Sequence, residues 1–394
     1  MKAVTWQGKR DVRVETVPDP TIQKPNDAVV RITSTALCGS DLHLYEVLGP
    51  FMEKGDILGH EPMGVVEAVG PAVSQIAVGD RVVIPFNIAC GTCDMCARGL
   101  QSQCETTQIR SHDKGAALFG YTKMYGEVPG GQADLLRVPF ADYGPVKVPE
   151  GPPDDRFLYL SDVLPTAWQA VQYAEVPAGG SVAIVGLGPV GEMSARVARH
   201  SGIGPIFGLD LVPDRLERAR ALGVEAFDVS GGSADAIAAI RDRTDGRGPD
   251  SVIDAVGMEA HGDMFGKVAH TMSGFLPGAV AAPMMQRAGI DRLAALKTSV
   301  ELVRRGGTIS IVGVYGGMVD PLPMMTLFDK QVSLRMGQAN VRRWIDDLLP
   351  LVVDEDVLGL EGFASHHVAL DEAPEAYERF QKKEAGTFKV VFRP

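Results

Sequence analysis

The chain has 394 residues, of which 45% are hydrophobic and 22% charged, and its formal net charge is −12. This length suffices for two domains with buried cores, at roughly 150 residues per domain, and the composition excludes disordered, fibrous and low-complexity classes. The acidic balance, with Lys and Arg scattered along the chain, argues against nucleic acid and anionic membrane surfaces as partners.

The sequence also bears on the compartment. No apolar run approaches the roughly 18 residues that a membrane span requires, and the initial Met-Lys-Ala-Val-Thr-Trp lacks the apolar centre of a signal peptide. All 5 cysteines lie between Cys38 and Cys104, an odd number that favours metal ligation over disulfides. We expect a cytoplasmic protein with no membrane partner.

Residues 1–163 are predicted to form a β-rich domain. Short β-branched runs at 28–33, 64–69 and 81–85 are separated by Gly, Pro and Asp. Within this stretch, Cys38 opens the segment Cys38-Gly-Ser-Asp-Leu-His43, and His60 follows in Gly-His-Glu-Pro. A catalytic zinc needs three protein ligands and one open position, so this pair requires one more His, Asp or Glu. Taken alone, a Cys and a His at this separation are more often a buried free thiol and a structural histidine.

The other four cysteines form a separate group. Cys90, Cys93, Cys96 and Cys104 are spaced C-x2-C-x2-C-x7-C. Four thiolates suit a tetrahedral zinc with no open position, so we expect a structural zinc that holds a loop in shape. An iron–sulfur cluster and free buried thiols are the two alternatives.

Residues 164–336 are predicted to form a doubly wound parallel sheet of the Rossmann type. A strand at 181–185 enters a glycine turn and a helix-compatible run to His200, and a second strand follows at 206–209. This strand, turn, helix and strand order is the βαβ unit of dinucleotide-binding domains.

The turn has the spacing G-x-G-x-x-G, which brings a pyrophosphate to a helix N-terminus. Asp210 ends the next strand, where a carboxylate accepts hydrogen bonds from the adenosine ribose and repels a 2′-phosphate, so NAD is favoured. Arg215 nearby would instead accommodate NADP, and a glycine turn that merely packs is a third interpretation. The predicted turn contacts are Gly186, Gly188, Pro189, Val190 and Gly191.

Two further segments complete the chain. Residues 258–290 lie between the strands predicted at 251–256 and 308–312, and they exceed a single crossover helix, so we interpret them as an insertion. The insertion would serve an oligomer contact or cover a bound cofactor. The tail from 337 to 394, with an amphipathic stretch at 372–383 and a strand at 389–392, is expected to return to the first domain.

Together these motifs resemble the zinc-dependent medium-chain alcohol dehydrogenases. The resemblance runs from Lys2 to Phe392 through the Cys38 and His60 motifs, the segment Gly79-Asp-Arg-Val-Val, the four-cysteine lobe and the glycine turn. The segments 161–166 and 119–133 are most similar to the formaldehyde dehydrogenase-like branch. The implied fold is a GroES-like β-rich catalytic domain plus a Rossmann domain.

The resemblance implies a catalytic zinc held by Cys38, His60 and Asp162, whereas the more familiar family pattern has a second cysteine at the third position. It implies that Glu61 is a carboxylate able to approach the zinc, and that Ser40 takes the substrate proton and passes it to His43. A structural acid at Glu61, a helix-capping Ser40 and a surface His43 are the alternatives.

The resemblance also implies contacts to the cofactor outside the glycine turn. Lys389 is expected near the pyrophosphate. The nicotinamide side and the strand ends contribute the others, which are Gly39, Thr166, Val256, Val312, Gly313, Val314, Gly337 and Gln338.

The implied function is hydride transfer between an alcohol or aldehyde and NAD, with one catalytic and one structural zinc per subunit, in a homodimer or homotetramer. One alternative is a nicotinoprotein that dismutes aldehydes with NAD that never leaves, an idea motivated by the 258–290 insertion. A second is a zinc-bearing binding protein without catalysis.

Overall fold

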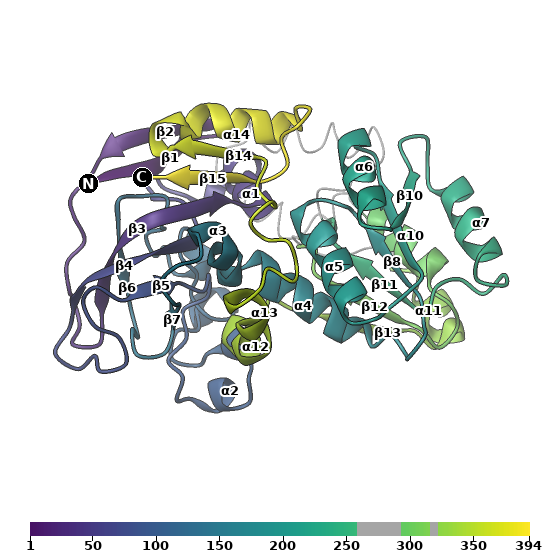
Figure 1. The fold of residues 1–394 in the computed structure, drawn as a ribbon, viewed down its shortest axis with the longest axis horizontal. Helices are drawn as coiled ribbons and strands as arrows, with labels where there is room; N and C mark the ends of the chain where they lie inside the picture. Colours follow the sequence, from purple (N-terminus) through teal and green to yellow (C-terminus); the bar gives the residue numbers. More distant parts are fainter. Residues whose placement is uncertain (258–292, 316–321) are drawn as a thin grey trace. The chain divides into compact units, whose positions relative to one another are not determined.

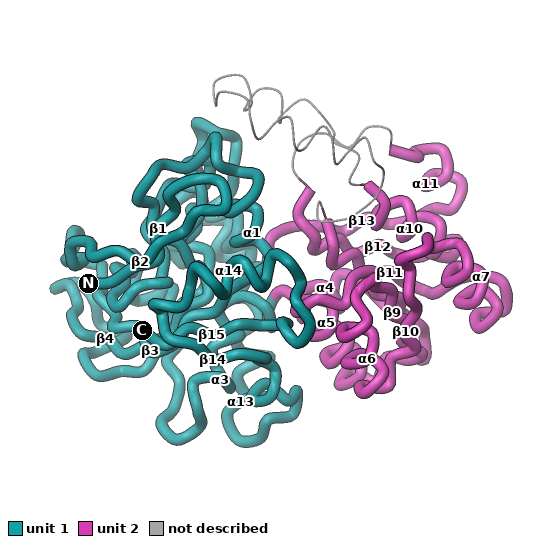
Figure 2. Tube along the Cα trace, turned by 90° about the horizontal axis from the view of Figure 1, so that it is seen from above, with its two compact units in different colours: residues 1–165, 339–394 teal, residues 166–338 magenta. Residues whose placement is uncertain are grey.

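The computed structural model describes residues 1–257, 293–315 and 322–394 (Figure 1). The chain divides into two compact units: unit 1 is Met1–Pro165 with Ala339–Pro394, and unit 2 is Thr166–Gln338 (Figure 2). From the sequence, the boundaries were expected at 163/164 and 336/337. The proposed insertion at 258–290 lies outside the described residues.

Unit 1 is built mainly from antiparallel strands. The pair β1-β2 forms one sheet, and a 7-stranded sheet has the order β14-β15-β3-β4-β5-β7, with β6 paired to β3. The β-rich first domain predicted from the sequence is confirmed. The strands are β1 (Lys2–Gly8), β2 (Asp11–Thr16), β3 (Ala28–Leu37), β4 (Glu61–Val69), β5 (Arg81–Val83), β6 (Leu135–Val138), β7 (Val146–Lys147), β14 (His366–Ala369) and β15 (Val390–Arg393).

The helices of unit 1 are short. They are α1 (Gly39–Glu46), α2 (Asp94–Ala97), α3 (Asp154–Phe157), α12 (Val341–Leu348), α13 (Pro350–Val353) and α14 (Ala373–Lys382), and α4 (Val163–Ala174) begins in unit 1 and continues into unit 2. The 3-10 turns are η1 (Gly49–Phe51), η2 (Gln101–Gln103), η3 (Arg110–His112), η4 (Lys123–Tyr125), η5 (Leu158–Ser161) and η7 (Leu370–Glu372).

One edge of the large sheet gathers segments that are far apart in the sequence. β3 ends at Leu37, which pairs with Val390 of the antiparallel β15, while Ala36 pairs with Glu61 at the start of β4. The residues that flank these strand ends, Cys38 and His60, therefore lie next to one another. The C-terminal strand returns to the first domain as expected.

The helix α14 belongs to the same unit because one of its faces is apolar. Ala373, Ala376, Tyr377 and Phe380 follow helical spacing and are buried, so they join the apolar cluster beneath β1 and β15. The C-terminal residues thus bring both a strand and a helix to the N-terminal part of unit 1.

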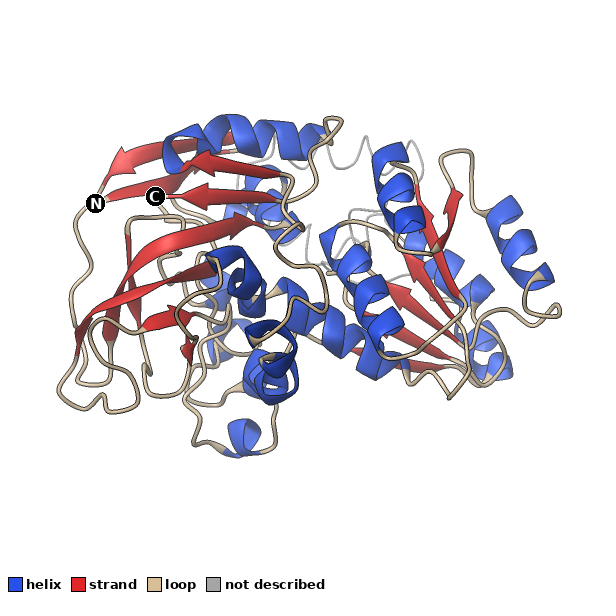
Figure 3. Ribbon diagram, viewed as in Figure 1, coloured by secondary structure: helices blue, strands red, loops and turns tan. Residues whose placement is uncertain are grey.

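Unit 2 contains a 6-stranded parallel sheet in the order β10-β9-β8-β11-β12-β13, flanked by helices (Figure 3). Strands β8, β11 and β12 are buried at every position, as parallel strands covered by helices require. The strands are β8 (Val182–Val185), β9 (Ile206–Asp210), β10 (Glu225–Asp228), β11 (Ser251–Asp254), β12 (Thr308–Ile311) and β13 (Ser333–Met336), and the helices are α5 (Pro189–His200), α6 (Pro213–Ala221), α7 (Ala234–Asp242), α10 (Ala294–Leu302) and α11 (Met324–Lys330).

The strand order reverses at β8, which lies between β9 and β11. In open parallel sheets, ligands bind outside the carboxyl ends of the strands at such a point. Register places Val185, Asp254 and Ile311 side by side, so the loops that follow β8, β11 and β12 emerge at one edge. The doubly wound sheet predicted from the sequence is confirmed.

Candidate functional site

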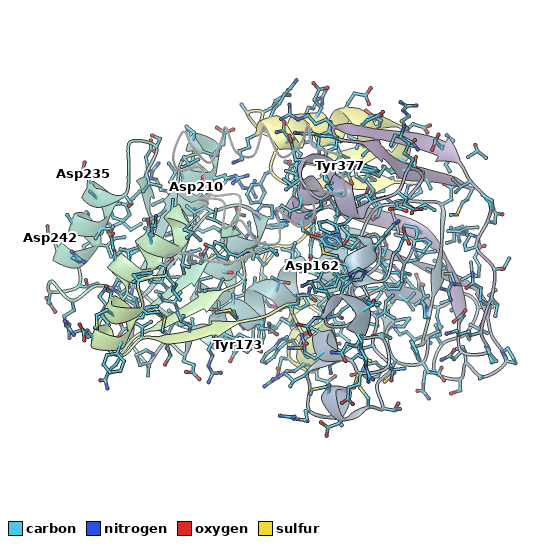
Figure 4. All side chains as sticks on the ribbon, turned by 180° about the vertical axis from the view of Figure 1, so that it is seen from behind. Asp162, Tyr173, Asp210, Asp235, Asp242 and Tyr377 are labelled. Carbon is cyan, nitrogen blue, oxygen red and sulfur yellow. The ribbon has the colours of Figure 1, made fainter. Side chains whose placement is uncertain are left out.

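Three side chains meet at the edge of the unit 1 sheet. Cys38 follows β3, His60 precedes β4, and Asp162, labelled in Figure 4, follows η5. The Cys38 Sγ lies 3.7 Å from Asp162 Oδ2, and that oxygen lies 3.3 Å from His60 Nε2. Together with Glu61, these residues offer ligand atoms that all lie within 4.8 Å of one another.

This arrangement fits a zinc ion. With Zn–S near 2.3 Å and Zn–N or Zn–O near 2.0 Å, tetrahedral geometry separates the ligand atoms by about 3.3–3.6 Å. The distance of 3.3 Å from Asp162 Oδ2 to His60 Nε2 lies in this range, and the distance of 3.7 Å to Cys38 Sγ lies just above it. One sulfur, one imidazole and one carboxylate leave a fourth position for a substrate oxygen, which is the composition of a catalytic zinc site.

The electrostatic environment of these four residues also favours a bound cation. Burial, and after it the carboxylates of Glu61 and Asp162, raise the pKa of the Cys38 thiol to about 11. Burial disfavours charge on His60, but Asp41, Asp162 and Cys38 outweigh it and raise the imidazole pKa well above its usual value. A divalent cation reverses this balance, because it deprotonates a coordinating thiol and favours neutral imidazole.

Asp41 supports two of these ligands, and the sequence analysis missed this role. Its Oδ1 lies 3.0 Å from His60 Nδ1, and its Oδ2 accepts a hydrogen bond of 2.9 Å from the Cys38 backbone N–H. With a metal ion on Nε2, which faces Asp162, the proton of a neutral imidazole would be on Nδ1, next to the Asp41 carboxylate. The sequence did contain a signal for this role, because Asp41 is the third residue of α1, a helix that begins directly after the candidate ligand Cys38.

Lys389 requires a correction. It was expected at the cofactor pyrophosphate, but its side chain is fully buried, with Nζ 2.7 Å from both carboxylate oxygens of Glu61 and 3.0 Å from the Leu37 carbonyl oxygen. The ammonium is therefore engaged inside unit 1. It compensates the charge of Glu61, which is also fully buried beside the candidate zinc ligands.

The residues of α1 expected to handle the proton lie close to the ligands. Ser40 Oγ is 3.1 Å from His60 Nε2 and 3.3 Å from Cys38 Sγ. The N-cap residue of α1 is Cys38, whose backbone N–H donates to Asp41 at N3, so Ser40 is not the capping residue. Gly39 is the first residue of α1, and His43, one turn along the same helix, is buried and not at the surface.

The four-cysteine lobe forms the second candidate metal centre. Cys90, Cys93, Cys96 and Cys104 offer sulfurs within 4.8 Å of one another, and the Cys93 and Cys104 sulfurs are 3.9 Å apart. Four Zn–S bonds near 2.3 Å in a tetrahedron place sulfurs about 3.8 Å apart. Although burial opposes it, hydrogen bonds from Thr106 and Thr92 lower the pKa of Cys90 to about 6, which favours the thiolate.

If this lobe holds a structural zinc, Cys104→Ser should lose one zinc ion per chain and lower the Tm by roughly 5–15 °C, because metal and folding energies are coupled. Metal analysis and calorimetry measure both quantities. Asp94→Asn, an exposed change in the same lobe, is the matched control. Unchanged zinc content and Tm in Cys104→Ser would show that the cysteines are free thiols.

The glycine turn of unit 2 has the geometry of a phosphate-binding turn. Gly186 has φ +89°, and a Cβ on Gly191 would lie 1.8 Å from the Gly186 carbonyl oxygen, so neither position tolerates a side chain. Helix α5 begins directly after Gly188, with Pro189 and Val190 in its first turn. Its N-terminal backbone N–H groups can therefore receive an anion.

Asp210 lies at this turn, at the end of β9 (Figure 4). Its Oδ2 accepts a 2.7 Å hydrogen bond from the Leu187 N–H, and its Oδ1 accepts bonds from Leu211 and Val212. Arg215 Nη1 lies 3.7 Å from Oδ2. The two residues that favour NAD and NADP respectively therefore stand next to each other.

The sequence analysis also missed the role of Asp254, which lies at the end of β11. Its Oδ1 accepts hydrogen bonds from Val256 and Gly257, and its carbonyl oxygen accepts bonds from Val312 and Gly313. A Cβ on Gly313 would lie 2.1 Å from the Gly257 nitrogen, so the two loops touch through backbone alone. Asp254 thus fixes both loops that were expected to hold the nicotinamide.

The remaining expected cofactor residues also lie in unit 2. Val314 follows β12 and is exposed, and Thr166 lies in α4. Gly337 and Gln338 follow β13, where their carbonyl oxygens accept hydrogen bonds from the Gln169 amide. Among the described residues, no helix has the length and apolar character needed to cross a membrane.

Comparison with known proteins places these features in a family. Residues 24–150 match the model of the alcohol dehydrogenase GroES-like domain, and residues 189–270 match that of the zinc-binding dehydrogenase. The chain is 38% identical over 404 residues to an uncharacterized zinc-type alcohol dehydrogenase-like protein, AdhB, of Bacillus subtilis, covering 100% of both chains.

Two further similarities extend the comparison. The formaldehyde dismutase of Pseudomonas putida is 32% identical, with 99% of this chain and 97% of that protein covered. The structure of alcohol dehydrogenase TADH from Thermus sp. ATN1 superposes with a TM-score of 0.81 at 35% identity, covering 100% of this chain and 99% of the other.

Proposed function

Since this chain belongs to the zinc-dependent medium-chain alcohol dehydrogenase family, we propose that it transfers hydride between a small alcohol or aldehyde and NAD. Formaldehyde and other small primary alcohols or aldehydes are the proposed substrates, in line with its similarity to formaldehyde dismutase. The observation that carries the proposal is the convergence of Cys38, His60 and Asp162 at zinc-ligand distances.

When bound, zinc supplies a Lewis acid that favours the deprotonated alcohol, and NAD supplies the hydride acceptor. Ser40 Oγ, beside His60 Nε2, is placed to accept the substrate hydroxyl proton, and His43 is the proposed next carrier. Asp41 keeps His60 in the tautomer that leaves Nε2 free. Lys389 neutralises Glu61, which limits the negative charge around the three ligands.

The residues of unit 2 hold the dinucleotide in this proposal. The N–H groups that follow Gly188 bind the pyrophosphate, Asp210 accepts from the adenosine ribose, and the loops fixed by Asp254 hold the carboxamide. Activity with a panel of small alcohols and aldehydes, with NAD and with or without glutathione, tests the proposal. No turnover by zinc-loaded protein across the panel would favour a zinc-bearing binding protein.

Asp162→Ala should lower kcat by more than about 100-fold, because loss of a mere supporting group at a metal site already costs about 10–100-fold. NAD affinity, measured by calorimetry, should not change, because the glycine turn and Asp210 lie in unit 2. Asp354→Ala, an exposed change in unit 1, is the control. A near-normal kcat in Asp162→Ala would refute the assignment of the third ligand.

The preference for NAD makes a second prediction. Asp210→Asn retains an acceptor oxygen but removes the charge that repels a 2′-phosphate, so kcat/KM for NADP relative to NAD should rise about 10–100-fold. Arg215→Ala should leave the NAD reaction nearly unchanged. If Arg215→Ala instead abolishes a strong reaction of the wild-type protein with NADP, the nucleotide assignment is reversed.

The similarity to formaldehyde dismutase supports a second candidate function. In dismutation, one hydrated aldehyde gives up hydride and becomes the acid, and a second aldehyde receives the hydride and a proton and becomes the alcohol. Bound NAD returns to its initial state in each cycle. Equal yields of acid and alcohol from dialysed protein without added NAD, with NAD retained at one per chain, would establish this function, and absence of bound NAD would exclude it.

Assembly into dimers or tetramers is also part of the proposal. β13 is an edge strand of the described sheet, and Met336 on it is exposed, as are Met325 and Phe328 on α11. An unpaired strand edge beside apolar side chains favours association. Light scattering on the purified protein measures the mass, and a monomer at micromolar concentration would contradict this part.

A further inference from the structure

Behind the His60 imidazole, a row of buried polar groups runs to the C-terminal helix. Asp41 Oδ1 lies 3.0 Å from His60 Nδ1, Gln132 Nε2 lies 3.4 Å from Asp41 Oδ2, and the Tyr377 hydroxyl lies 2.8 Å from Gln132 Oε1. Asp41, Gln132 and Tyr377 are fully buried, and His60 is 4% exposed. The four residues come from four separate segments of unit 1, and Tyr377, which lies on α14, is labelled in Figure 4.

The direction of each hydrogen bond follows from the chemistry of the groups. The Asp41 carboxylate only accepts, so Gln132 must turn its amide NH2 toward it. The Gln132 carbonyl oxygen then faces Tyr377, whose hydroxyl must donate. The Gln132 amide therefore donates to the Asp41 carboxylate, and the Tyr377 hydroxyl donates to the carbonyl oxygen of that same amide.

Gln132 cannot swing away from this position. A Cβ on Gly59 would lie 2.4 Å from Gln132 Cγ, so the side chain is packed against the glycine backbone just before His60. Its own N–H donates to the Leu58 carbonyl oxygen at 2.9 Å, and its carbonyl oxygen accepts from Val4. Only a glycine at position 59 leaves room for this amide.

The row is surrounded by apolar side chains, so burying its polar groups costs free energy unless they form hydrogen bonds. Tyr377 belongs to the cluster that includes Leu44, Leu58 and Phe392, and its ring centroid lies 5.5 Å from that of Tyr45. A hydroxyl or amide buried there without partners costs a few kcal/mol, about 1–3 for each group. The hydrogen bonds toward Asp41 remove that cost and fix the carboxylate.

We propose that Gln132 and Tyr377 are positioning residues for the catalytic zinc: they hold Asp41 so that it orients His60 and Cys38 together. This rests on the proposed function only for the identity of the metal. Asp41 contacts His60 through one oxygen and the Cys38 backbone N–H through the other, so a displaced Asp41 disturbs two of the three ligands. The hydroxyl of the C-terminal helix thereby contributes to metal retention.

The test measures zinc release from the zinc-loaded protein to a chelator, followed with a colorimetric zinc indicator. The four-cysteine zinc is the internal control, because its ligands lie outside the row. Gln132→Leu preserves side-chain size but removes the donor, and should speed release of the catalytic zinc about 10-fold. Tyr377→Phe removes only the hydroxyl and should speed it about 3-fold, while release from the four cysteines is unchanged in both variants.

The double variant gives a sharper result. Because Tyr377 acts through the Gln132 amide, adding Tyr377→Phe to Gln132→Leu should produce no further acceleration. Tyr45→Phe, which removes a hydroxyl from the neighbouring ring, is the matched control and should behave like the wild type. When cobalt replaces the catalytic zinc, the visible spectrum of Gln132→Leu should also differ from that of the cobalt-substituted wild-type protein.

Three outcomes would overturn the inference. They are wild-type release of the catalytic zinc in Gln132→Leu, equal acceleration of both zinc ions, which indicates general loosening, and additive effects in the double variant. A wild-type protein that holds zinc only at the four cysteines would refute the proposed function instead. The two failures are therefore distinguishable.

Discussion

The structure of unit 1 depends on gathering acidic groups at a largely buried site. Cys38, Asp41 and Glu61 are buried beside Asp162, and the buried ammonium of Lys389 pairs with Glu61. Burial disfavours charge on each of them unless a cation is present. A divalent metal ion at the ligand atoms would supply that charge, and the surrounding hydrogen bonds position the atoms that would face it.

The C-terminal segment is as important to this site as the N-terminal segment. β15 pairs with β3 and places Lys389 beneath Glu61, and α14 places Tyr377 behind Gln132. The chain thus leaves unit 1 to form the parallel sheet of unit 2 and then returns to complete the surroundings of Cys38, His60 and Asp162. The loops of unit 2 are shaped by fewer kinds of contact. These are close backbone contacts at glycines and the buried carboxylates of Asp210 and Asp254, which lie at the ends of two strands.

The sequence alone predicted the features that depend on residues close together in the chain. The glycine turn, the four-cysteine spacing and the alternation of strand and helix depend on residues that are close in the chain. The structure contains the parallel sheet and brings the four sulfurs within 4.8 Å of one another. Asp162 is separated from Cys38 by 124 positions, so only the family resemblance identified it. Asp41, Gln132 and Asp254 were missed because their roles depend on partners that tertiary packing supplies. The same reason explains the error at Lys389, since a lysine next to a strand is ordinarily exposed, and its burial depends on Glu61.

The most direct measurement is the location of zinc by anomalous X-ray diffraction at the zinc edge on crystals of the active, zinc-loaded protein. We expect two peaks per chain, one among the four cysteines and one bonded to Cys38 Sγ, His60 Nε2 and an Asp162 oxygen at about 2.0–2.3 Å. A catalytically active chain with zinc only at the four cysteines, or with its second zinc away from these three residues, would contradict the assignment.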